Sequence, residues 1–222
     1  MAATQLTAQQ AFGSFFGVVA EGRSYLNILY LLLAFPLGIA YFIFLSVGWS
    51  LGLGLLIIWI GLIVLAAVLG GSWLFSAFER QQAIHLLGAE VRPMWSETDT
   101  SDESVWNRFV AFLGNRVTWT GMVFLLLKFP LGVASFIVAI TSLSISVSCL
   151  LAPFYYRWNR PDFSFWVVDT LPEALLCSLI GAIFLILSLH LLNGLAWVWK
   201  GLSRMLLGQS GIVEMGNGEA AA

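Results

Sequence analysis

Charged residues are scarce in this sequence. Only 10% of its 222 residues are Asp, Glu, Lys or Arg, and 59% are hydrophobic, whereas a soluble domain carries about 25% charged residues. This composition excludes an ordinary soluble domain and indicates an integral membrane protein surrounded by the lipid bilayer. The formal net charge is −2 and no basic block occurs, so we expect no binding of nucleic acid.

Side chains for catalysis are also few. The two histidines, His85 and His190, lie at different predicted depths, and the sequence has no H-E-x-x-H and no phosphate-binding glycine loop. We therefore expect no enzymatic activity, no cofactor and no metal. Apolar residues flank Cys149 and Cys177, which favours two buried free thiols, with a bridge as the alternative. No secretory signal is recognisable at the N-terminus.

Long apolar runs predict four transmembrane helices. The first block, residues 25–77, is long enough for two spans of about 20 residues, with a turn at Val47–Gly54. Further spans are expected at 118–147 and 171–197.

Basic residues predict the orientation, because short loops rich in Lys and Arg stay in the cytoplasm. Most of them fall on one side of the predicted spans: Arg23, Arg80, Arg92, Arg108, Arg116, Lys200 and Arg204. Only Arg157 and Arg160 fall on the other. We expect a multi-pass protein of the cell membrane with both termini in the cytoplasm.

The sequence contains an internal repeat. Residues 30–44 and 124–138, at an offset of 94, share ten identities in fifteen positions. Upstream, residues 12–19 and 106–113 carry apolar residues at i, i+3, i+4 and i+7, the pattern of an amphipathic helix.

This repeat predicts an all-α fold of two tandem helical hairpins, each preceded by an interfacial amphipathic helix. Repeat one spans 12–88 and repeat two 106–208, both inserted the same way up. They belong to a membrane domain at 24–208, preceded by a cytoplasmic segment at 1–23 and followed by a tail at 209–222 that we expect to be disordered.

Each repeat contains the step Phe-Pro-Leu-Gly within a predicted span. Pro36 and Pro130 should kink their helices at matching depths, and Gly38 and Gly132 should admit a close neighbouring helix. One interpretation is a packing kink; the other is a hinge or a binding point, which paired Pro/Gly interruptions mark in transporters.

Lys128 precedes the second of these steps and has no counterpart charge in the first repeat. A lone ammonium is costly in a bilayer, so we expect its stem to snorkel toward the cytoplasmic headgroups. The alternative makes it the partner of a polar group in the bundle, with His190 at a similar predicted depth. No carboxylate is expected nearby, and a proton relay would therefore lack its central part.

The predicted outward segment between spans three and four, residues 152–175, mixes charged and aromatic side chains. They anchor the chain at the membrane interface, or they contact a small amphiphile, a lipid headgroup or a partner. The candidate sensory residues are Arg157, Trp158, Arg160, Asp162, Trp166, Asp169 and Glu173.

The paired F-P-L-G steps, with the endings "ERQQAIHLLG" and "WKGLSRMLLG", resemble a sensor domain family, a four-helix membrane module found at the N-terminus of bacterial and archaeal histidine kinases. The resemblance covers residues 24–208. It implies a sensory module that passes a signal to a cytoplasmic output, and it supplies no ligand residues. Kinase members continue into a dimerisation helix and an ATP-binding domain, whereas this sequence ends in a short tail.

Three hypotheses follow. The first is a stand-alone sensor-like protein of a two-component type, which signals through a histidine kinase or another regulator in trans. The second is a small transporter or channel, assembled as a homodimer around Lys128 and His190. The third is a structural subunit of a larger membrane complex.

Overall fold

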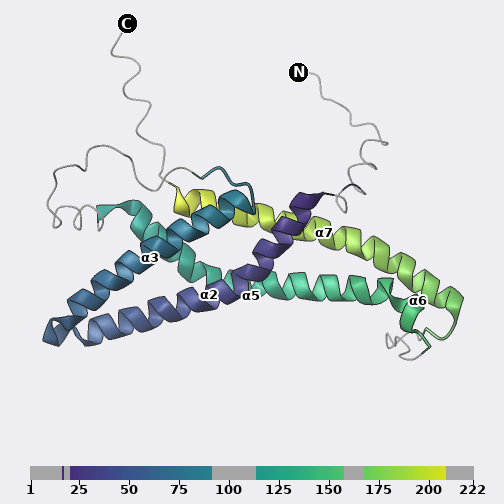
Figure 1. Cartoon of the computed structure of the whole chain (residues 1–222), viewed down its shortest axis with the longest axis horizontal. Helices are drawn as coiled ribbons and strands as arrows, with labels where there is room; N and C mark the ends of the chain where they lie inside the picture. The colour runs from purple at the N-terminus through teal and green to yellow at the C-terminus, as the bar shows by residue number, and fades with distance from the viewer. Residues whose placement is uncertain (1–16, 18–20, 92–113, 158–167, 209–222) are drawn as a thin grey trace, which may run out of the picture. The chain divides into compact units, whose positions relative to one another are not determined.

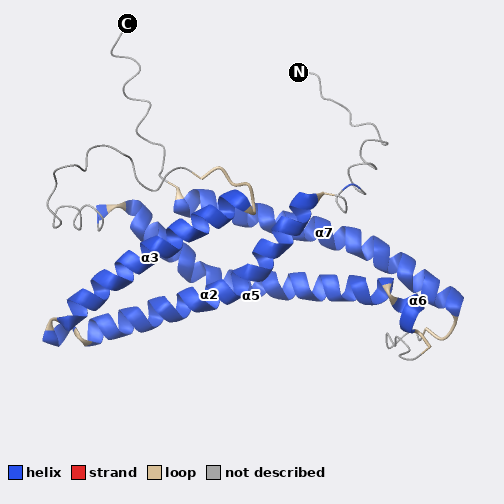
Figure 2. Cartoon of the chain, viewed as in Figure 1, coloured by secondary structure: helices blue, strands red, loops and turns tan. Residues whose placement is uncertain are grey.

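The structure, a computed structural model, describes residue 17 and residues 21–91, 114–157 and 168–208 (Figure 1). This part of the chain is helical and contains no strand (Figure 2). Its long helices are α2 (Gly22–Gly54), α3 (Ile60–His85), α5 (Arg116–Leu150) and α7 (Leu171–Leu207). The short helices η1 (Leu56–Ile58) and α6 (Ala152–Tyr155) follow α2 and α5.

Each long helix is apolar and long enough to cross a membrane. A 33-residue helix such as α2 is about 50 Å long, and the hydrocarbon core of a bilayer is only about 30 Å thick. The chain is therefore a multi-pass membrane protein, and the predicted all-α fold with four apolar spans is confirmed for the described residues. The predicted interfacial helices at 12–19 and 106–113 lie outside them, apart from Gly17.

Contacts divide the chain into two units, which we call unit 1 (residues 1–34 and 133–197) and unit 2 (residues 35–132 and 198–222). The division passes through α2 between Ala34 and Phe35, through α5 between Gly132 and Val133, and through α7 between Trp197 and Val198. The divisions of α2 and α5 are at the edges of the two Phe-Pro-Leu-Gly steps. Each of α2 and α5 is thus a continuous helix with one part in unit 1 and the other part in unit 2.

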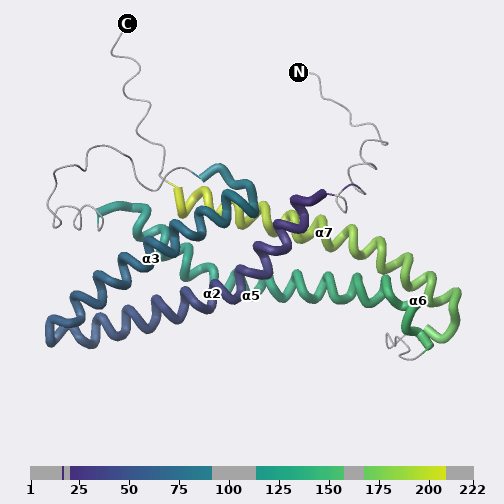
Figure 3. Tube along the Cα trace, viewed as in Figure 1, coloured from purple at the N-terminus to yellow at the C-terminus, as the bar shows by residue number. Residues whose placement is uncertain are grey.

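The first helical hairpin, α2–η1–α3, turns later than predicted (Figure 3). A turn at Val47–Gly54 is wrong, because α2 remains helical through Gly54. Gly48 and Gly52 are used for packing: a Cβ on Gly52 would lie 2.5 Å from Leu65 Cδ2 of α3, and one on Gly48 would strike Val68. At i and i+4 the two glycines share one face, where they let α2 and α3 approach closely.

Helix α3 continues well past the end of its apolar run and stops at His85. Gly88, with a φ of 58°, ends the helix, and the Ala89 N–H donates to the Ala83 carbonyl. Arg80 Nη2 donates to the Val91 carbonyl at 2.8 Å, so the following segment is held against the helix. As a result, Glu79 lies inside α3 and not in an aqueous loop.

The two helices that contain a Phe-Pro-Leu-Gly step begin at corresponding positions. Helix α2 begins at Gly22 and α5 at Arg116, 116 − 22 = 94 residues later, and their internal prolines are 130 − 36 = 94 residues apart. The duplication of the whole hairpin with its preceding helix stays a prediction.

Candidate functional site

Unit 2 contains a buried ion pair. Lys128 of α5 places its Nζ against Glu79 Oε2 of α3, and both side chains are 0% exposed. Tyr41 of α2 donates from its hydroxyl to Glu79 Oε1 at 2.8 Å. The ring centroid of Trp199, from the end of α7, lies 5.8 Å from Lys128 Nζ. Each of the long helices thus contributes one residue, and we call these four residues the polar core.

Aromatic side chains enclose the polar core. The ring of Trp199 meets Phe124 edge-on, with centroids 6.1 Å apart, and Phe75 lies 5.1 Å from the ring of Tyr41. Tyr41, Phe124 and Trp199 are all buried. In this apolar setting the carboxylate compensates the ammonium charge, and the face of the indole adds a cation–π attraction.

Gly38 brings α2 directly against α5 beside the ion pair. A Cβ on Gly38 would lie 2.7 Å from the Lys128 carbonyl oxygen and 2.9 Å from Phe129 Cα. One turn later, Phe42 stacks on Phe129 with ring centroids 4.7 Å apart. The glycine of the first Phe-Pro-Leu-Gly step therefore has a steric role, because any side chain there would push the two backbones apart.

The remaining residues of the two steps have matching surroundings. Pro36 and Pro130 are exposed on the outside of α2 and α5, whereas Gly132, like Gly38, is buried. Their proposed role as hinges is a dynamic property and stays a prediction.

The structure corrects the prediction for Lys128. Snorkelling is wrong, because the lysine is fully buried and paired with Glu79. The expectation of no carboxylate nearby is wrong for the same reason. The apolar run predicts a second span that ends near residue 77, whereas α3 continues to His85 and presents Glu79 on its buried face.

His190 is exposed on α7, and its Nδ1 lies 3.0 Å from the Ile186 carbonyl oxygen in the preceding turn. It belongs to unit 1, whereas Lys128 belongs to unit 2. A pairing of His190 with Lys128 stays a prediction.

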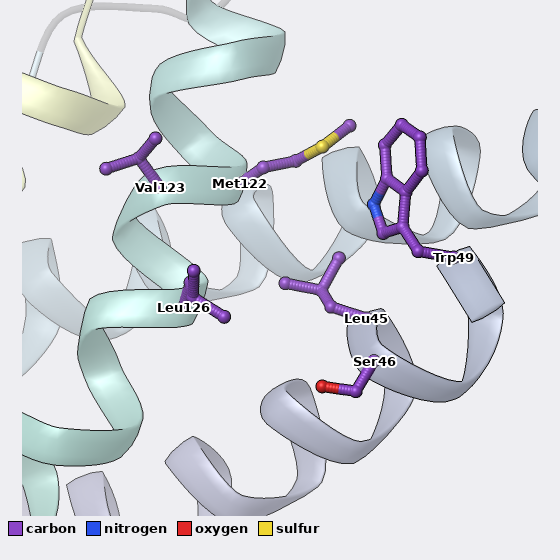
Figure 4. A pocket seen from close by; sticks show the side chains of 6 residues that line it. All are labelled: Leu45, Ser46, Trp49, Met122, Val123 and Leu126. Carbon is purple, nitrogen blue, oxygen red and sulfur yellow. The ribbon is translucent and has the colours of Figure 1, made fainter.

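An apolar pocket of about 220 Å³ opens between α2 and the first half of α5, within unit 2 (Figure 4). Met122 extends from α5 toward Trp49 of α2 (Figure 4). Val123 and Leu126, two of its lining residues, are about half exposed, so the pocket is open at its edge. The lining residues are Leu45, Ser46, Trp49, Met122, Val123 and Leu126.

The candidate sensory segment is described only at its two ends. Arg157 and Asp169 are exposed. Glu173 Oε2 accepts the backbone N–H groups of Asp169 and Thr170 at 3.0 and 3.1 Å, so this carboxylate caps the start of α7. Trp158, Arg160, Asp162 and Trp166 lie outside the described residues.

The prediction for the cysteines is confirmed: Cys149 and Cys177 are free and buried. They belong to one apolar cluster with Ala152, Val168 and Ala174. No group of three or more His, Cys, Asp or Glu side chains suited to a metal occurs within the described residues.

Polar contacts between helices of unit 1 were not predicted from the sequence as pairs. Asn27 of α2 donates to Asn193 Oδ1 of α7 at 2.9 Å, and Asn193 Nδ2 donates to Ser24 Oγ at 2.9 Å. The hydroxyl oxygens of Ser146 and Ser188 lie 3.2 Å apart between α5 and α7. Asparagine inside an apolar run was the available signal, because it needs a partner in lipid.

Apolar spans joined by a buried ion pair define the class of this protein, a polytopic membrane protein with a polar core. Its residues 30–207 match the model of a family described as "Sensor: Putative sensor", and the chain belongs to this family. Comparisons with curated proteins and with solved structures found no match.

Proposed function

We propose that the protein is a sensor-like module that converts an event at the membrane into a change in helix packing and passes it to a separate cytoplasmic partner, a histidine kinase or another regulator. Membership of the sensor family supports the sensory role. The observation that carries the mechanism is the polar core, in which one residue from each long helix meets at Lys128 and Glu79.

A buried ion pair is suited to a two-state device. Removing one partner of such a pair costs about 3–5 kcal/mol, because a charge is left uncompensated. A displacement of either helix that separates Lys128 from Glu79 therefore has to end in a second arrangement in which both groups are again satisfied. A stimulus selects the second arrangement only if it binds that arrangement better.

The Phe-Pro-Leu-Gly steps are the sites where this motion would bend the helices. Proline removes one backbone hydrogen bond and weakens the turn before it. Pro36 and Pro130 stand beside the divisions of α2 and α5 between unit 1 and unit 2. Bending at these prolines would therefore keep most of the contacts inside each unit. Gly132 borders Val133 at the division of α5 and would bend with Pro130, whereas Gly38 packs against the backbone of α5.

The output end is the C-terminal part of α3. Glu79 belongs to the ion pair, and the next residue, Arg80, holds the Val91 carbonyl. A rotation of α3 that breaks one contact moves the other, so the segment after α3 reports on the polar core. The bias of Lys and Arg favours a cytoplasmic position for this segment and for both termini.

The test is a comparison of variants in lipid nanodiscs. Hydrogen exchange at residues 86–91 should be faster in Lys128→Met than in the wild type, because loss of the ion pair loosens Arg80 from Val91. Lys200→Met, a lysine of α7 outside the ion pair, is the matched control. Equal exchange in all three proteins would show that the polar core and the output segment are uncoupled.

The partner is tested by cross-linking in native membranes followed by mass spectrometry. We expect a kinase or response regulator whose recovery changes when Pro36→Ala and Pro130→Ala are combined. Unchanged recovery would contradict the hinge.

A second candidate function is a small transporter or channel, assembled as a homodimer. The observation that favours it is Glu79, because a carboxylate beside Lys128 supplies the group that a proton relay needs. Proton flux in proteoliposomes, measured with an entrapped pH dye, should then be abolished by Glu79→Gln in a protein that still unfolds cooperatively. Absence of flux in the wild type removes this candidate.

A further inference from the structure

The end of the first hairpin carries no charge. Between Arg23 and Glu79 the sequence contains no Asp, Glu, Lys, Arg or His, and the turn after α2 lies near the middle of this stretch. We call residues 55–63 the hairpin tip. Its side chains point away from the protein: Ile57 is 89%, Trp59 81% and Ile63 71% exposed.

The backbone of the hairpin tip is closed on itself. Gly61 is the residue that permits this, since a Cβ there would strike the Gly52 carbonyl and the Leu56 amide nitrogen. Backbone donors in the tip find carbonyls in the same turn: Leu55 N–H to Leu51, Ile58 to Leu55, Trp59 to Leu56, Gly61 to Leu55 and Leu62 to Trp59. Each backbone polar group left without a partner in the bilayer core costs several kcal/mol, so these hydrogen bonds lower the cost of placing the turn in lipid.

The end of the second hairpin, where α5 is connected to α7, differs because it carries charged side chains. Arg157 and Asp169 are exposed there, and Glu173 is bonded to backbone N–H groups at the start of α7. Charged side chains of this type belong in water or among headgroups. The two hairpins therefore present different surfaces at the ends where their helices turn.

The length of α2 also favours contact with lipid. Its 33 residues measure about 50 Å, against a hydrocarbon core of about 30 Å. A helix that protruded would carry Val47, Leu51 and Leu53, each about half exposed, into water. Tilting keeps these side chains and the tip in the bilayer.

We propose that the hairpin tip is immersed in the bilayer, with Ile57 and Ile63 among acyl chains and Trp59 at the boundary with the headgroups. It occupies the leaflet opposite the one that holds Arg23.

The first experiment measures depth with spin labels. In a Cys149→Ala/Cys177→Ala protein reconstituted in liposomes, single cysteines at Ile57, Ile63, Asp169 and Leu179 are labelled with a nitroxide. Leu179 is the lipid-facing reference, because it is 60% exposed on α7. We expect labels at Ile57 and Ile63 to be accessible to oxygen and shielded from a water-soluble nickel chelate, like the label at Leu179 and unlike the label at Asp169.

Two results would overturn the proposal. Accessibility at Ile57 equal to that at Asp169 would place the tip in water. Shielding from both reagents, with dipolar broadening between labels, would show that a second copy of the chain covers it.

A second experiment needs no introduced thiol. The emission of Trp59, obtained as the difference between the wild type and Trp59→Phe, should be quenched by lipids brominated near the headgroup and not by iodide. Quenching by iodide alone contradicts immersion.

Discussion

Removing the ammonium of Lys128 alone should destabilise the protein more than removing the polar groups of Lys128, Glu79 and Tyr41 together. Lys128→Met keeps the length of the aliphatic stem and deletes the ammonium. Glu79 is then left without its counter-charge in a site where it is 0% exposed, and it keeps the hydrogen bond from the Tyr41 hydroxyl. The structure therefore predicts a large loss of stability from one conservative change.

Two different magnitudes can be expected for this loss of stability. Breaking a buried ion pair by removing one partner costs about 3–5 kcal/mol, whereas polar contacts between membrane helices average only about 0.6 kcal/mol. The larger value should apply, because both groups are fully buried and no lipid headgroup reaches them. For a chain of this size it corresponds to a fall in Tm of about 6–20 °C.

The matched variant removes the ammonium of Lys128, the carboxylate of Glu79 and the hydroxyl of Tyr41 together. The variant Lys128→Met with Glu79→Leu and Tyr41→Phe leaves neither a charge nor a hydroxyl of this set without its partner. Its free energy of unfolding should therefore lie within about 2 kcal/mol of the wild-type value, which is the size of a buried cation–π contact. Thermal unfolding in one detergent compares the single variant, the triple variant and Lys200→Met. If the Lys128→Met protein were as stable as the Lys200→Met protein, the ion pair would not be buried in the folded protein.

Two further predictions concern packing. Gly38→Ala should lower the free energy of unfolding by about 1–3 kcal/mol, because overpacking forces the backbones apart. Its Cβ would lie 2.7 Å from the Lys128 carbonyl oxygen. Gly70→Ala is the control and should be close to neutral in thermal unfolding, because a Cβ there has nothing within 4 Å. Cys149 and Cys177, which are 8% and 2% exposed, should react with a water-soluble maleimide only after unfolding in SDS, and rapid labelling of the native protein would contradict their burial.

Local patterns in the sequence were enough to predict the class of the protein and its spans. The scarcity of charge and the long apolar runs indicate membrane helices whatever their partners, because each helix satisfies its own backbone hydrogen bonds in lipid. The prolines at residues 36 and 130 were correctly placed within helices for the same reason.

Glycine was misread where its role depended on a neighbour. Gly48 and Gly52 were read as a turn, since glycine commonly breaks helices. In the folded chain they are contact points for Val68 and Leu65 of α3. A sequence pattern does not distinguish these two uses, because the difference is the presence of another helix within a few ångströms.

The sequence by itself determined that this chain spans a membrane with four apolar helices, and that Lys128 needs a way to satisfy its charge. Only the tertiary structure decided how. Glu79 is 49 residues away along the chain, and it becomes the partner of Lys128 because α3 stays helical beyond its apolar run and turns that carboxylate inward. Hydrophobicity is a property of each segment alone, whereas the pairing of two buried charges depends on the distance between helices.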